Sequence, residues 1–183
     1  LDPAYETLVS SRSIFTNIYD TLVWRDAKGK LLPSLAESWK WLNQTTLQLN
    51  LRKGVKFHNG DLFTADDLIW TSNRYMDKED RKPLYSYVKG LYKTIEKKDD
   101  YTVVMHLAKP NAMQFGDFAR MPVLPKKAFL AMGKEKFSAS PIGTGPFKFE
   151  RWDRNEQLVL VAFDDHWRGR PSVDKYVIKP IPE

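Results

Sequence analysis

LRKGVKFHNGDLFTADD, residues 51–67, leads from an alternating stretch through two glycine turns into a helix start. Glycine accepts a positive φ without steric cost, so Gly54 and Gly60 predict turns. Thr64, followed three residues later by Asp67, resembles a capping box, and the helix dipole favours negative charge in that first turn. The stretch therefore predicts a strand end, two turns and a capped helix, in which the carboxylates serve helix initiation.

On both sides of this stretch, short alternating segments and helical segments follow one another, which is typical of a mixed α/β or α+β fold. In TTLQLNLR, residues 45–52, leucines alternate with polar residues, so one face of a sheet is half-buried. The other expected elements are an amphipathic helix at 13–23, a helical or turn element around 35–39, a strand at 101–110, helices within 112–137, a hairpin of strands at 147–152 and 157–163, and a strand near 174–182.

Length and composition predict a globular chain with a real core, since 42% of its 183 residues are hydrophobic. The absence of cysteine excludes disulfides, thiolate metal sites and cysteine nucleophiles. The net charge of +6 suits an acidic partner, but acids interrupt the basic residues, which favours a solvated surface over a nucleic-acid face. The longest apolar run, 158–163, is far short of the roughly 20 residues that cross a bilayer. The start without Met suggests a mature or trimmed chain.

The residue types that carry catalysis are present, but not in catalytic patterns. The three histidines, His58, His106 and His166, lack partners at metal-ligand spacing. GTGP at 143–146 has neither phosphate-loop pattern and is followed by a strand, so it is interpreted as a bend between lobes. There is no GxSxG motif. Most tryptophans are assigned to the core by default, with a ligand groove as the alternative. We expect no enzymatic activity, no cofactor and no metal.

Several segments together resemble the family 5 extracellular solute-binding proteins of ABC importers. The matching segments, in the family's order, are LDPA at 1–4, IYDTLV at 18–23, LLPSLAESW at 31–39, LRKGVKFHNGDLFTADDLIWT at 51–71, LPKKAF at 124–129, PIGTGPFKFERW at 141–152 and FDDHWRGRPSVDKYVIKPIP at 163–182. The segment at 51–71 is close to the family's diagnostic signature. The resemblance is specific for the family and weakly informative for the ligand.

The resemblance implies a periplasmic binding protein type II-like fold, in which two lobes close on a ligand about a hinge. It assigns 1–42 and 140–183 to a discontinuous main lobe and 43–139 to an inserted small domain that carries the signature, away from the ligand. The strand that usually precedes LDP and the second lobe that usually follows are expected to be absent from these 183 residues. The chain is thus expected to be the first lobe alone.

The resemblance also implies ligand contacts from three loops. The residues at those positions are Thr7, Leu8, Val9, Tyr85, Arg120 and Met121. Arg120 suits a peptide or organic acid, because a guanidinium can hold a carboxylate through two parallel hydrogen bonds. Each position also has an ordinary structural interpretation, as a lead into a helix, a packed surface ring or a solvated charge.

The expected function is the capture of a small solute (a peptide, an organic acid or a metal complex) for a membrane permease, outside the cytoplasm. The location is periplasmic or extracytoplasmic, and a lipid anchor is an option for the full-length protein. Two other classes stay open: a ligand-sensing receptor domain, and an enzyme or nucleic-acid-binding module that uses the basic surface. A single lobe is expected to bind its solute weakly, and its exposed surface favours self-association.

Overall fold

The computed structural model describes residues 1–5, 9–77, 88, 90–110 and 114–179. In chain order the elements are α1 (Val9–Ile18), β1 (Val23–Arg25), β2 (Leu31–Pro33), β3 (Ala36–Asn43), β4 (Thr46–Leu51), α2 (Ala65–Met76), β5 (Tyr92–Asp99), β6 (Thr102–Leu107), α4 (Gln114–Phe118), α5 (Lys126–Met132), α6 (Lys134–Ala139), β7 (Phe147–Asp153), β8 (Gln157–Ala162) and β9 (Lys175–Ile178). The predicted mixed α/β fold is confirmed. Within the part of the chain that the structure describes, every helix is too short or too polar to cross a membrane.

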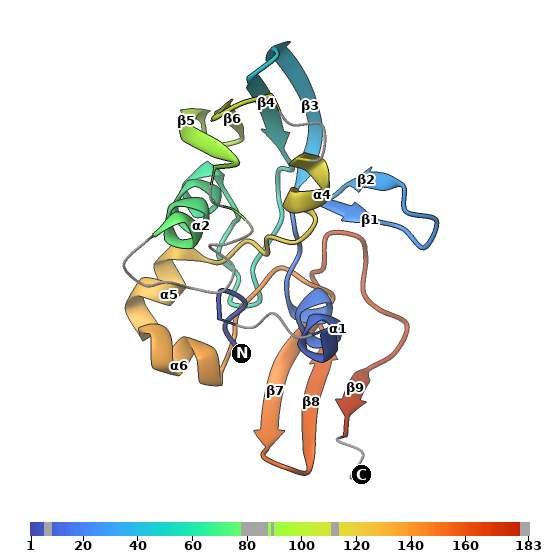
Figure 1. The fold of residues 1–183 in the computed structure, drawn as a ribbon. Helices are drawn as coiled ribbons and strands as arrows, with labels where there is room; N and C mark the ends of the chain where they lie inside the picture. Colours follow the sequence, from blue (N-terminus) through green and yellow to red (C-terminus); the bar gives the residue numbers. More distant parts are fainter. Residues whose placement is uncertain (6–8, 78–87, 89, 111–113, 180–183) are drawn as a thin grey trace.

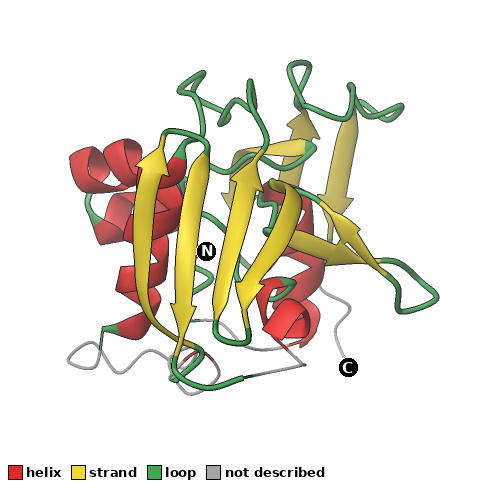
Figure 2. Ribbon diagram, turned by 90° about the horizontal axis from the view of Figure 1, so that it is seen from above, coloured by secondary structure: helices red, strands yellow, loops and turns green. Residues whose placement is uncertain are grey.

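The larger sheet is antiparallel, with strand order β3-β4-β6-β5, and Figure 2 shows its strands side by side with helices on one side. Leu49 of β4 lies opposite Trp39 of β3 and Val103 of β6. Leu47, Leu49 and Leu51 are almost completely buried, as their alternation predicts. They form one hydrophobic cluster with the signature segment and α2.

The smaller sheet has the order β7-β8-β9, and α1 packs against it (Figure 1). The predicted hairpin is confirmed: β7 pairs with β8 around a turn in which Asn155 has a φ of 65°. The second hydrophobic cluster includes side chains from α1, α5, α6, β7 and β8. α5 and α6 thus share a core with the smaller sheet.

The signature has the predicted structure. Gly54 and Gly60 have φ angles of 74° and 89°. The Thr64 N–H donates to the Asp67 carboxylate at 3.0 Å, and α2 follows directly. The other Asp67 oxygen accepts the Lys126 N–H at 2.9 Å, so one carboxylate caps α2 and also holds the start of α5.

Two local predictions are wrong. The helix expected at 13–23 lies at Val9–Ile18, and Val23 already belongs to β1, which pairs with β2 in a separate two-stranded ribbon. The segment around 35–39, expected to be helical or a turn, enters β3 because its backbone pairs with β4. In both cases backbone pairing with the next strand in the sequence overrides the local preference.

The tryptophans are less buried than the core default predicts, since Trp41 and Trp152 are 40% and 42% exposed. The predicted division at 42/43 and 139/140 stays a proposal. Contacts cross both predicted boundaries. Strand β3 pairs with β4 across 42/43, and α5 and α6, which precede 139/140, pack with the smaller sheet, which follows it.

Candidate functional site

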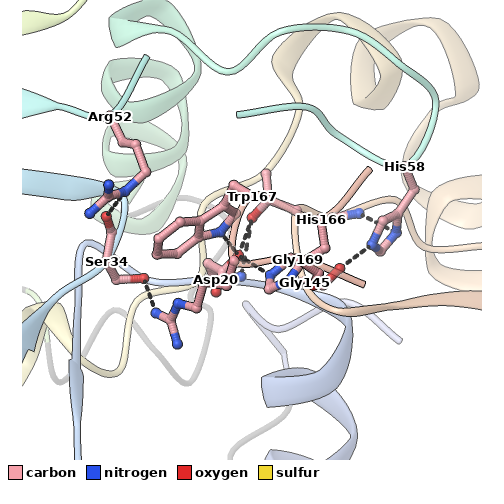
Figure 3. A network of polar contacts seen from close by, with 11 residues as sticks. Asp20, Ser34, Arg52, His58, Gly145, His166, Trp167 and Gly169 are labelled. Carbon is pink, nitrogen blue, oxygen red and sulfur yellow. Dashed lines mark hydrogen bonds and ion pairs between the residues drawn. The ribbon is translucent and has the colours of Figure 1, made fainter. Parts of the chain in front are cut away.

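Asp20, just after α1, is the centre of a buried polar junction (Figure 3). Its side chain is 10% exposed. One carboxylate oxygen accepts the Thr144 hydroxyl at 3.0 Å and the Trp167 indole N–H at 2.9 Å. The Asp20 backbone N–H donates back to the same Thr144 hydroxyl at 3.3 Å. One residue therefore joins the end of α1 to two loops more than 120 positions away in the sequence.

The GTGP loop lies directly against the end of α1. The Gly145 N–H donates to the Ile18 carbonyl at 2.9 Å, so the loop satisfies a carbonyl that the ending helix leaves unpaired. A Cβ at Gly143 would lie 2.0 Å from the Ile18 oxygen, and one at Gly145 would lie 2.5 Å from the Asn17 oxygen. Glycine is required here because the two backbones approach so closely.

His58 holds the same loop from the opposite side (Figure 3). Its Nδ1 accepts the Gly143 N–H at 3.1 Å, and its Nε2 lies 3.0 Å from the Gly145 carbonyl. Because a carbonyl only accepts, Nε2 carries the proton and the ring is neutral. Burial lowers the pKa of His58 from 6.5 to about 4, and the nearby Lys148 acts in the same direction. His58 thus links the signature segment to the loop that borders α1, and we call its two ring contacts with Gly143 and Gly145 the His58 clasp.

Trp167 and two guanidinium groups form the outer part of the junction. The guanidinium carbons of Arg52 and Arg168 lie 4.4 Å and 4.3 Å from the centre of the Trp167 ring system. Both side chains also donate to Ser34. Arg52 donates to the Ser34 carbonyl at 3.0 Å, and Arg168 donates to the Ser34 hydroxyl at 3.2 Å. Burial lowers the pKa of Arg168, against the opposing field of Asp20. Cation–π contacts and hydrogen bonds together hold the loop after β8 against the start of β3.

His166 lies in the same junction and is 5% exposed at its side chain. Its Nδ1 is 3.2 Å from the Gly169 carbonyl, so Nδ1 donates. Its Nε2 lies 3.9 Å from the Asp20 carboxylate, beyond hydrogen-bond distance. Among the residues that the structure describes, no group of three or more His, Cys, Asp or Glu side chains is arranged to hold a metal ion.

The six predicted ligand contacts are only partly accessible to the structure. Thr7, Leu8 and Tyr85 lie outside the described residues. Val9 is the first residue of α1. Arg120 is exposed just after α4, whereas the Met121 side chain is 5% exposed and packs in the larger hydrophobic cluster. These ligand roles remain predictions.

The segment after Met121 is tied to the Asp20 junction. The Val123 N–H donates to the Asp20 carbonyl at 3.0 Å, and Thr21 forms an isolated β-bridge with Pro122. The Tyr75 hydroxyl of α2 donates to the Pro122 carbonyl at 2.8 Å. The chain just after Met121 therefore lies against the residues that follow α1.

The chain before α1 has its own anchor. Asp2 and Arg74 of α2 form a nearly buried ion pair, with side chains 4% and 9% exposed. Asp2 also accepts the Ala4 N–H at 3.0 Å. Breaking such a pair by removing one partner typically costs about 3–5 kcal/mol. The start of the chain is thus held on α2, and the end of α1 is held at Asp20.

Sequence reasoning missed the Asp20 junction. Asp20 lies within a segment expected to be an amphipathic helix, where an acid is an ordinary surface residue. The available signal was indirect: GTGP was interpreted as a bend between lobes, and the segment DHWRG belongs to the resemblance without an assigned role. Nothing in local spacing connects them to Asp20.

The sequence profile of the family "Bacterial extracellular solute-binding proteins, family 5 Middle" matches residues 30–183. The oligopeptide-binding protein AppA of Bacillus subtilis is 33% identical over 98% of this chain and 34% of its own length. Heme-binding protein A of Haemophilus influenzae is 31% identical over 91% of this chain and 35% of its own.

Solved structures agree. AppA in complex with a nonapeptide covers 100% of this chain and 38% of its own at a TM-score of 0.90, with 32% identity. DppA of Helicobacter pylori, in complex with the peptide STSA, covers 99% of this chain and 40% of its own at a TM-score of 0.88, with 31% identity. The chain spans about a third of the length of the curated relatives it matches, 34% and 35% for the two named above. It belongs to the bacterial extracellular solute-binding proteins of family 5.

Proposed function

We propose that this chain is part of the solute-binding component of an ABC importer, which captures a peptide or a similar small solute for delivery to a membrane permease. The observation that carries the proposal is the likeness to AppA in complex with a nonapeptide, over the whole of this chain. The proposed location is periplasmic or extracytoplasmic. The proposed role is binding without chemistry.

The geometry supports binding on a rigid scaffold. The three described contact positions, Val9, Arg120 and Met121, lie on segments whose other ends are tied to the Asp20 junction. Binding residues are commonly carried at the margins of such scaffolds. The exposed Arg120 supplies a guanidinium that suits a carboxylate at one end of a peptide. A permease that recognises the closed form requires the solute to bind closed better than open.

Calorimetric titration tests the proposal, on the 183-residue chain and on the complete product of the gene that contains it. The probes are a nonapeptide, the tetrapeptide Ser-Thr-Ser-Ala, an organic acid and a complex of nickel with L-histidine. Suppose that the complete protein binds a peptide at about 1 μM, or −8.2 kcal/mol, and that each lobe supplies half of the interaction. The single lobe then retains about −4.1 kcal/mol, or 1 mM. We expect weak binding or none by the shorter chain. Nanomolar binding by the shorter chain would contradict the expectation that two lobes share the contacts with the solute. Binding to DNA and to none of the four probes would overturn the proposal.

Self-association of the isolated chain is a separate prediction. Strand β9 is at the edge of its sheet, and Tyr176 and Val177 on it are 39% and 46% exposed. Exposed apolar edge strands favour pairing between chains. Sedimentation velocity across a concentration series should show dimers or larger species, and Val177→Lys should reduce them. A monomer at all concentrations would contradict the prediction.

A further inference from the structure

Asp20 is connected to both described contact segments, although it belongs to neither. Upstream, α1 runs from Val9 to Ile18, two residues before Asp20, and the Gly145 N–H holds its last carbonyl. Downstream in the sequence, the Val123 N–H reaches the Asp20 carbonyl at 3.0 Å, two residues after Met121. The two segments lie far apart in the sequence, and they meet at Asp20 and at the next residue, Thr21, which bridges to Pro122.

The hydroxyl of Thr144 fixes the conformation of Asp20. It donates its single proton to the carboxylate at 3.0 Å, and its oxygen accepts the Asp20 backbone N–H at 3.3 Å. The backbone that faces Val123 is therefore oriented by the same side chain that holds the carboxylate. Thr144 is 0% exposed, so water does not readily replace this hydroxyl.

We propose that Asp20 is a positioning residue for solute binding: held by Thr144 and Trp167, it keeps the α1 segment and the Arg120–Met121 segment in one fixed arrangement. The role of Asp20 in solute binding rests on the proposed function. The coupling of the two segments through Asp20 does not depend on it. Loss of the hydroxyl at position 144 frees both segments together. The larger sheet is unaffected, because its strands are held by their own backbone pairing and not by Thr144.

The variants are Thr144→Val, which removes the hydroxyl at nearly constant shape, and Thr144→Ser, which keeps it. Thr94→Val on the exposed β5 position is the matched control, since it makes the same change away from the junction. Amide hydrogen exchange and amide chemical shifts are measured by NMR on the 183-residue chain. The reporters are the amides of α1, Arg120, Met121 and Val123, with the amides of β4 and β6 as an internal reference.

In Thr144→Val we expect exchange at the hydrogen-bonded amides of α1 and at Val123 to rise at least tenfold, with shift changes at Val9, Arg120 and Met121. Thr144→Ser and Thr94→Val should stay within threefold of the wild type. The β4 amides should be unchanged in all variants, and the β6 amides should be unchanged in both Thr144 variants, since Thr94 itself pairs with His106 of β6. Equal acceleration everywhere, or a response in only one of the two segments, would overturn the proposal.

Titration of the wild type with Ser-Thr-Ser-Ala separates a failure of the proposed function from a failure of the positioning role of Asp20. If the complete protein binds the peptide, Thr144→Val should weaken that binding about tenfold and Thr144→Ser should restore it; unchanged affinity in Thr144→Val would overturn the role in solute binding. If the wild type binds no probe, the proposed function fails, and the exchange data still decide whether Asp20 couples the segments.

Discussion

The His58 clasp makes the stability of this chain depend on pH in a defined window. Its ring is neutral in the fold, because Nδ1 accepts the Gly143 N–H while Nε2 donates to the Gly145 carbonyl. A second proton on the ring removes the acceptor at Nδ1. Burial accordingly lowers the pKa of His58 from 6.5 to about 4.

The direction of this pH dependence follows from the difference in proton binding between the folded and unfolded chains. The unfolded chain binds the proton more readily than the folded chain, so the contribution of His58 is complete above pH 6.5 and declines as pH falls towards about 4. A pKa difference of one corresponds to about 1.4 kcal/mol, so the whole window is worth roughly 3 kcal/mol. Below pH 4 the loss is complete. Asp20, His166 and Lys148 are the charged or titratable groups whose fields act on this ring.

The assay is urea denaturation of the wild type and of His58→Asn at intervals from pH 7.5 to 3.5. The asparagine oxygen can still accept the Gly143 N–H, but the donor to Gly145 is lost, so the variant should be less stable at pH 7.5 by about 1–3 kcal/mol. The difference between the two proteins should shift in favour of the variant by roughly 3 kcal/mol between pH 6.5 and 4. Leu130→Ala, at an exposed position of α5, changes no titratable group; it is the control and should keep the wild-type slope in this window. A difference between wild type and His58→Asn that is constant across the window would refute the clasp.

Three further changes test other contacts. Gly145→Ala places a Cβ 2.5 Å from the Asn17 oxygen, so we expect a loss of about 1–3 kcal/mol or more in the free energy of unfolding by urea; an unchanged midpoint would mean that the loop yields easily. Asp67→Ala removes a carboxylate that serves both α2 and α5, and should cost about 1–3 kcal/mol by thermal or urea unfolding; a loss confined to about 0.5 kcal/mol would show that the contact with α5 contributes little. Arg120→Ala should weaken peptide binding by the complete protein about tenfold or more without altering its thermal stability, whereas Arg154→Ala in the β7–β8 turn should leave affinity unchanged; equal affinities would remove Arg120 from the site.

The signature and the strands show how far local pattern reaches. The alternation of Leu47, Leu49 and Leu51 predicted a strand with one buried face, and the capping box at Thr64 predicted the start of α2. The β7–β8 hairpin followed from two alternating runs around a short polar turn. Each of these depends on residues within a few positions of one another, so the sequence alone suffices.

The candidate site was predictable only in outline. The resemblance indicated a solute-binding family and six contact positions, of which Val9, Arg120 and Met121 lie among the described residues. It did not indicate that the segments bearing them meet at Asp20. The sequence showed only that His58 lacks a partner at metal-ligand spacing, because its structural partners lie 85 and 87 positions further along the chain.

The elements whose periodicity, turns and caps are local follow from sequence alone: the buried alternation of β4, the glycine turns and the capped start of α2. Tertiary structure alone decided that α1 ends at Ile18, that the segment around 35–39 is a strand, and that Asp20 is a junction rather than a surface acid. Each of these depends on partners outside the segment itself: β4 for the 35–39 segment, and the far loop around Thr144 and Gly145 for Ile18 and Asp20. Local propensity is weak compared with the cost of leaving a buried polar group unpaired.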